Sequence, residues 1–173
     1  IVKVSSIGIG GPYNSMLRSP VLGQRLFDLF HYLRWETSVP LHLNEFAILI
    51  IARQWRSQVE WFAHAPIAAK AGLSAGIIAG LKTGARPSGM AEDEAAVYDF
   101  VTELTTARKV SDATYAKAKR VLSDQQIVDL TAVAGNSVTI TGTGTAAIAF
   151  GNLDVLDGAT GVAISSSTRP IAF

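Results

Sequence analysis

The segment at residues 45–64, EFAILIIARQWRSQVEWFAH, constrains the fold more than any other part of the chain. Its apolar block at residues 46–52 is followed at once by Arg53 and Arg56. It is therefore shorter than the roughly 18 to 20 apolar residues that span a bilayer. The block predicts a helix of a globular protein and not a membrane span. Because the first residues also lack a signal-peptide layout, we expect a cytoplasmic location without membrane association.

Helical periodicity continues on both sides of this segment. Between residues 20 and 37, apolar side chains recur at the spacing of one helix face, at Leu22, Leu26, Leu29, Phe30 and Leu33. Pro40 predicts an end to that helix, because proline disfavours a helical residue before it. Capping residues and further stripes predict helices from residue 41 and at 57–70, 75–81, around 97–104, at 111–122 and from 123 onward. The predicted fold is all-α.

The two ends of the chain differ from this helical region. Residues 1–19 contain Gly8, Gly10, Gly11 and Pro12, so they predict an irregular N-terminal arm. Residues 136–173 are rich in Gly, Thr and Ala, and we interpret them as a C-terminal extension with a short strand at 137–141 and an extended arm at 159–173. The helical domain then covers residues 20–135.

Composition excludes several classes of function. The chain has no cysteine, which removes disulfides, thiolate metal sites and thiol catalysis together. Its formal net charge is +1 and its basic residues are scattered, so nothing indicates a nucleic-acid-binding face. His31 and His42 have no acidic or histidine neighbour at metal-ligand spacing, and we expect no metal site.

A polar cluster at the end of the constraining segment suggests acid/base chemistry. Ser57, Glu60 and His64 stand at i, i+3 and i+7, and therefore share one face of a helix. The i, i+4 spacing lets the Glu60 carboxylate hydrogen-bond the imidazole, fix its tautomer and raise its pKa. The alternative is an exposed helix pair in which Glu60 bridges to Arg56.

Three further residues could complete such a site. Glu45 precedes the apolar block, where it either supplies a second carboxylate or merely favours the helix dipole. Arg53 could hold a substrate carboxylate or neutralise Glu60. Trp61, like Trp55, could wall a pocket, or belong to the core or a subunit contact.

One motif in the extension imitates a nucleotide-binding fingerprint. Residues 138–147, VTITGTGTAA, resemble a strand followed by GxGxxA. A dinucleotide-binding unit also needs a following helix, a second strand and an acidic residue about 20 positions further on. This context is missing, and we do not expect a dinucleotide cofactor.

The order of these residues resembles the carboxymuconolactone decarboxylase and AhpD-like superfamily over roughly residues 11–135. The resemblance rests on GPYNSMLRSP, LRWETSVP, LNEFAILIIAR, QVEWFAHAPIAAKAGLS, VSDATY and SDQQIVDL. In the peroxidase branch a Glu precedes CxxCxxxH, and these positions correspond to Glu45, Ser57, Glu60 and His64. Since Ser57 and Glu60 occupy the cysteine positions, thiol peroxidase activity is not expected. The C-terminal extension departs from the family, whose members usually continue with a bulky helical segment.

The resemblance implies an AhpD-like helical fold that forms trimers or hexamers, has no cofactor and acts on a small acidic substrate. It implies a lyase similar to 4-carboxymuconolactone decarboxylase. His64 would then donate a proton, Glu60 would orient it and set its pKa, and Glu45 would be a second relay carboxylate. Arg53, Ser57 and Trp61 would contact the substrate. Another small-metabolite isomerase or hydrolase, and a catalytically silent oligomeric binding protein, remain alternatives.

Overall fold

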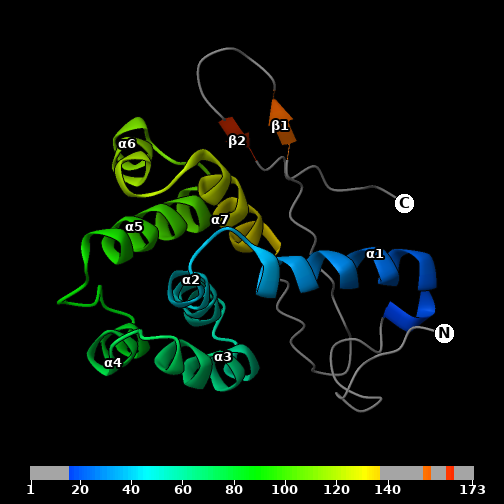
Figure 1. Cartoon of the computed structure of the whole chain (residues 1–173), viewed down its shortest axis with the longest axis horizontal. Coiled ribbons are helices and arrows are strands. Elements are labelled where there is room, and N and C mark those ends of the chain that lie inside the picture. Colours follow the sequence, from blue (N-terminus) through cyan, green and yellow to red (C-terminus); the bar gives the residue numbers. More distant parts are fainter. Residues whose placement is uncertain (1–15, 137–153, 157–162, 166–173) are drawn as a thin grey trace.

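The computed structural model describes residues 16–136, 154–156 and 163–165, and the described chain is dominated by helices, as predicted (Figure 1). A short antiparallel pair of strands lies in the C-terminal extension, with Val155 opposite Ile164. The elements are α1 (Pro20–His31), the π-helical turn η2 (Tyr32–Glu36), α2 (Leu41–Gln54), α3 (Gln58–Lys70), α4 (Ala75–Thr83), α5 (Glu92–Ala107), α6 (Asp112–Val121), α7 (Asp124–Asn136), β1 (Asp154–Leu156) and β2 (Ala163–Ser165).

Helix α2 is the central element of the bundle, with α3, α4, α5 and α7 packed around it (Figure 1). It is apolar on nearly all sides, which is the pattern of a helix buried in a protein core. The side chains of Phe46, Leu49 and Ile50 are buried in one cluster with Phe100 of α5 and Leu130 of α7. The apolar block that constrains the sequence is thus the core of the fold.

Hydroxyl caps set the helix boundaries, as the sequence predicts. The side chains of Ser74 and Ser111 accept the backbone N–H groups of Ile77 and Thr114, and so begin α4 and α6. Ser123 and Gln126 form the predicted reciprocal capping box at the start of α7. These caps satisfy N–H groups that a helix cannot pair internally.

The first predicted helix is interrupted. The α-helical pattern ends at His31, and residues Tyr32–Glu36 continue as a π-helical turn before the chain reaches Pro40. The side chain of Asp129 on α7 accepts the backbone N–H of Ser38 at 2.8 Å and the Tyr32 hydroxyl at 3.1 Å. Long-range contacts with α7 therefore hold this wider turn, which periodicity along the chain does not reveal.

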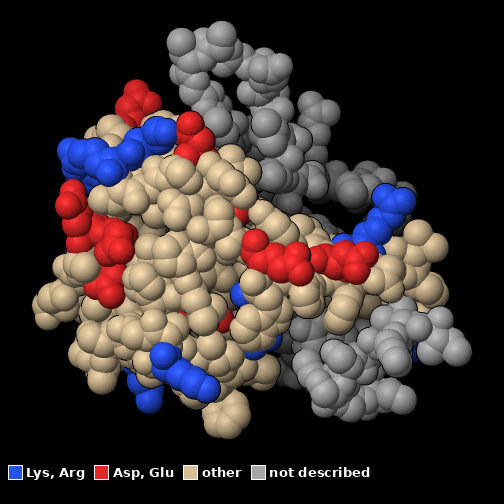
Figure 2. Space-filling view, in the orientation of Figure 1, with Lys and Arg blue, Asp and Glu red and all other residues tan. Residues whose placement is uncertain are grey.

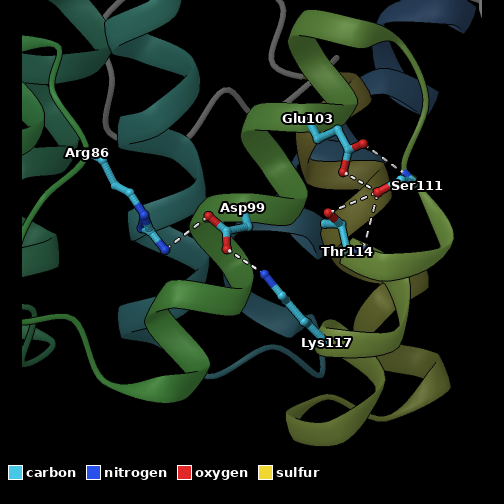
Figure 3. A network of polar contacts seen from close by, with 6 residues as sticks. All are labelled: Arg86, Asp99, Glu103, Ser111, Thr114 and Lys117. Carbon is cyan, nitrogen blue, oxygen red and sulfur yellow. Dashed lines mark hydrogen bonds and ion pairs between the residues drawn. The ribbon is translucent and has the colours of Figure 1, made fainter.

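Charged side chains of both signs gather over α5 and α6 (Figure 2). There Asp99 pairs with Arg86 at 3.1 Å and with Lys117 at 3.9 Å. A second group joins Glu103 to Ser111, and Ser111 to Thr114 (Figure 3). Lys117 and Ser111 thus join α6 and its N-cap to α5, whereas Arg86 joins the segment before α5 to that helix.

Several sequence-based predictions lie outside the described residues, namely most of the N-terminal arm, the strand at 137–141 and the GxGxxA-like motif. Within the predicted extended arm at 159–173, only β2 is described. No described helix combines the length and the apolar character needed to cross a bilayer.

Candidate active site

The imidazole of His64 lies between two carboxylates. Its Nδ1 is 2.7 Å from Oε2 of Glu45, and its Nε2 is 3.3 Å from Oε2 of Glu60. The Glu45 side chain has no exposed surface, the His64 side chain is 6% exposed and the Glu60 side chain 37%. The structure therefore brings together the three residues that the sequence proposes as catalytic, with Glu60 on the side nearest solvent.

The pairing of α2 with α3 builds this arrangement. Glu45 lies on α2, whereas Glu60 and His64 lie one turn apart on α3. The chain reverses between the two helices through Arg56, whose φ of 55° is in the left-handed region. The two helices then pack along each other, so the buried Glu45 reaches His64 across their interface. The alternative ion pair of Glu60 with Arg56 does not occur, since the Glu60 carboxylate faces His64.

Two opposing influences determine the protonation of His64. Burial is the largest, and it lowers the pKa of His64 because the imidazolium loses hydration. Hydrogen bonds with Glu45 and then with Glu60 favour the imidazolium, and their combined effect leaves the pKa of His64 above its ordinary 6.5. The imidazolium is thus favoured relative to a free histidine, and Nε2, the nitrogen beside Glu60, is the ring atom that faces the more exposed carboxylate.

Ser57 and Trp61 have structural contacts close to this centre. Ser57 is buried and is the N-cap of α3, where its hydroxyl oxygen lies 3.4 Å from the backbone nitrogen of Glu60. Trp61 is partly buried against the core cluster. Ser57 thus fixes the turn of α3 that carries Glu60, and the described contacts give Trp61 a packing role.

The side chain of Arg53 is bonded to helix α4 and not to His64 or Glu60. Its Nε donates to the carbonyl of Lys82 at 3.0 Å, and an Nη donates to the carbonyl of Thr83 at 3.4 Å. The guanidinium thereby caps the C-terminal end of α4, where helix carbonyls lack internal partners. Neither predicted role, as substrate clamp or as neutraliser of Glu60, fits this position. Helical spacing along one chain could not reveal it, because the acceptors come from another helix.

The remaining histidines each meet one carboxylate. His31 Nδ1 lies 3.2 Å from Glu36, and His42 Nε2 lies 3.8 Å from Asp93. In the part of the chain that the structure describes, no group of three His, Cys, Asp or Glu residues is arranged to hold a metal ion.

Two residues near the candidate site, Asn44 and Arg34, were not predicted from the sequence. Asn44 is buried, and its Nδ2 donates to the carbonyl of Leu33 at 2.9 Å, which fixes η2 against α2. Arg34, the next residue of η2, lies close enough to His64 that its charge opposes protonation of the imidazole. The sequence gives one indication of Arg34: it is a charged residue that directly follows Leu33, the last residue of the apolar stripe in the first predicted helix.

No protein-family model, curated protein or solved structure matches this chain. A function is therefore inferred from the geometry of the site and from the resemblance described above.

Proposed function

We propose that the protein is a cofactor-independent lyase that decarboxylates a small carboxylated lactone similar to 4-carboxymuconolactone. The observation that carries the proposal is the buried imidazole of His64 between Glu45 and Glu60. This geometry supplies a proton donor with a raised pKa, which is the group that such a reaction needs. The resemblance to the decarboxylase branch supplies the substrate class.

The reaction divides into a bond cleavage and a protonation. When the carbon–carboxylate bond breaks, carbon dioxide leaves and its electron pair enters the lactone ring, where the negative charge spreads onto the carbonyl oxygen. This delocalisation replaces a cofactor as the electron sink. His64 then delivers the Nε2 proton to a ring carbon, and the imidazole regains a proton from solvent by way of Glu60.

The distances favour an exchange of the roles expected for the two carboxylates. Glu45 is fully buried and closer to the ring, so it orients the imidazole and sets its pKa. Glu60 is more exposed and faces Nε2, which suits a relay between His64 and water. We propose Glu45 as the orienting group and Glu60 as the relay.

Self-association into trimers or hexamers is also part of the proposal. The α3 residues Val59 and Phe62 are exposed, Phe62 to 84%, although α3 carries the catalytic imidazole. Helix α1 extends beyond the rest of the bundle and exposes Val21 and Leu22 (Figure 1). Apolar surfaces of this kind are typical of contacts between subunits. We further propose a cytoplasmic location.

The test is carbon dioxide release from 4-carboxymuconolactone by the wild-type protein, His64→Ala and Glu60→Gln. Asp99→Asn, which changes an ion pair on the α5–α6 surface, is the control. Loss of the proton donor should slow turnover by about 10²- to 10⁴-fold. The control should match the wild type, and circular dichroism should show that all variants are folded. Unchanged turnover in folded His64→Ala would refute the assignment.

Two other results would select the alternatives. Consumption of a lactone without carbon dioxide release would favour an isomerase or hydrolase. Ligand binding without turnover would favour a catalytically silent binding protein.

A further inference from the structure

Arg34 carries a guanidinium whose own contacts are incomplete. Its Nε is buried, and no acceptor for it exists among the described residues. Within that part of the chain no carboxylate lies at ion-pair distance from it, and its described neighbour is the Trp35 ring, 4.9 Å from Cζ. A buried N–H group without an acceptor is costly. The position therefore suits a ligand that brings its own acceptor oxygens.

Hydrogen bonds among the described residues fix the backbone around Arg34, although its Nε has no acceptor among them. Asp129 holds Tyr32 and Ser38 on either side, and Asn44 holds the carbonyl of Leu33. Asn44 immediately precedes Glu45 on α2, so these bonds hold η2 against the part of α2 that carries the buried carboxylate. Single-turn π-helices are frequent at functional sites because they redirect a side chain within a helix.

Binding of an anionic ligand at this site requires a further positive charge. The imidazolium of His64 has one positive charge, whereas Glu45 and Glu60 together bring two negative charges. This excess negative charge would repel an anionic ligand. Arg53 cannot offset it, because its guanidinium caps α4. Arg34 follows Leu33, whose carbonyl is bonded to Asn44, the residue before Glu45, and so lies on the side of the site. An arginine can hold a carboxylate with two parallel hydrogen bonds.

Which carboxylate Arg34 holds follows from the chemistry of decarboxylation. A substrate of the 4-carboxymuconolactone type carries a carboxylate and a carboxymethyl group on the same ring carbon. The carboxylate leaves as carbon dioxide, and the carboxymethyl group stays in the product. Binding the leaving carboxylate tightly would stabilise the ground state and slow the reaction. Binding the retained carboxylate positions the ring without this penalty.

We propose that Arg34 binds the retained carboxymethyl group of the substrate and so determines the specificity of the His64 site for an anionic lactone. This inference rests on the proposed function for its substrate class. The inference is carried by the buried Arg34 Nε without an acceptor among the described residues, the fixed π-helical turn and the two carboxylates beside His64.

The test uses a saturated γ-butyrolactone that bears one carboxymethyl group, together with its neutral amide. The acid lacks both the leaving carboxylate and the ring double bond, so it is a binding probe and not a substrate. Calorimetry should show that wild-type protein binds the acid more tightly than the amide, and the acid should shift the His64 ring resonances. Arg34→Gln should weaken acid binding by about 10- to 100-fold, the range of a charge-assisted hydrogen-bonded pair, and leave amide binding unchanged.

Two variants sharpen the test. Arg34→Lys keeps the charge without the bidentate geometry and should bind the acid with intermediate affinity. Arg56→Gln removes an exposed arginine from the α2–α3 turn and should bind as the wild type does. A wild-type protein without preference for the acid, or a folded Arg34→Gln that keeps the preference, would overturn the proposal.

This binding experiment separates the two proposals. Arg34-dependent acid binding without carbon dioxide release from 4-carboxymuconolactone would refute the lyase and leave the Arg34 site standing. Carbon dioxide release that depends on His64, together with acid binding that Arg34→Gln does not change, would support the lyase and refute the Arg34 site.

Discussion

Two regions of the molecule use ionisable side chains in opposite ways. Between α2 and α3, one imidazole and two carboxylates meet in a buried site, and burial works against the charge that the hydrogen bonds favour. On the α5–α6 surface, Asp99 meets Arg86 and Lys117 with side chains that are partly in solvent (Figure 3). Water screens the second group but hardly reaches the pair of His64 and Glu45, and only Glu60 of the first group is partly in solvent. Similar ion pairs should therefore differ strongly in their effect on folding and on proton affinity.

Removing the buried carboxylate should have the largest effect on stability. Glu45→Ala deletes the partner of His64 and leaves a gap beside the core, which we expect to lower the free energy of unfolding by about 3 to 5 kcal/mol. Denaturant unfolding at neutral pH measures this change. A loss below about 1 kcal/mol would mean that the buried pair is no more important than a surface pair.

Asp129 provides an intermediate case, since it is buried but its partners are neutral. Asp129→Asn should lower the free energy of unfolding by about 1 to 3 kcal/mol, because Ser38 and Tyr32 lose a charged acceptor. It should also weaken acid binding, because η2 carries Arg34. If unfolding is affected while acid binding by Arg34 is not, the contacts of Asp129 do not position that side chain.

The two regions should lose stability at opposite ends of the pH range. Since the pKa of His64 is raised by folding, its stabilising contribution is full below pH 6.5 and disappears as pH rises through the raised value. The pKa of Glu103 is lowered, first by a hydrogen bond with Thr114, so its contribution is present above pH 4.5 and disappears as pH falls through the lowered value.

Unfolding curves of His64→Gln and Glu103→Gln across the pH range separate these contributions. Each difference from the wild type should become independent of pH at the end of the range where its group has lost its advantage. The His64 ring resonances should also titrate above pH 6.5 in the wild type and at lower pH in Glu45→Gln. Titration of His64 below 6.5 in the wild type would contradict the pairing.

The smallest effect should come from the surface ion pairs. Lys117→Ala removes a partner that lies 3.9 Å from Asp99, and we expect a change of at most about 0.5 kcal/mol in the free energy of unfolding. High salt should reduce even this difference. A change as large as that of Glu45→Ala would erase the contrast between the two regions.

Local signals predicted most of the fold. Ser74, Ser111 and the Ser123–Gln126 box act within one turn of the chain, so their roles can be predicted from spacing. Val97 and Phe100 form a periodic stripe, and both are buried. The interruption at Tyr32 was not predicted, because the contacts with Asp129 that hold it come from almost a hundred positions further along the chain.

In the candidate site, too, contacts within one helix were predicted better than contacts between helices. The i, i+4 spacing predicted that Glu60 meets His64, since both lie on α3. The contact of Glu45 was proposed from its unusual place before an apolar block, and tertiary packing made it the closer partner. Arg53 was placed wrongly and Arg34 was overlooked. In both cases the deciding contacts join different helices, and spacing in one chain cannot indicate them.

The π-helical turn η2 also constrains how related sequences can diverge. A π-helical turn holds one residue more than an α-helical path, and each residue of a helix accounts for a rotation of about 100°. Deleting a single residue between Tyr32 and Glu36 would let the turn close as a regular α-helix, with Leu29 still on the core side. The side chains within the turn, which include Tyr32 and Arg34, would each change direction by about that angle, and Tyr32 would lose its hydrogen bond with Asp129. Insertions and deletions should therefore be excluded from this turn in any homologue that retains the site, even where its individual side chains have changed.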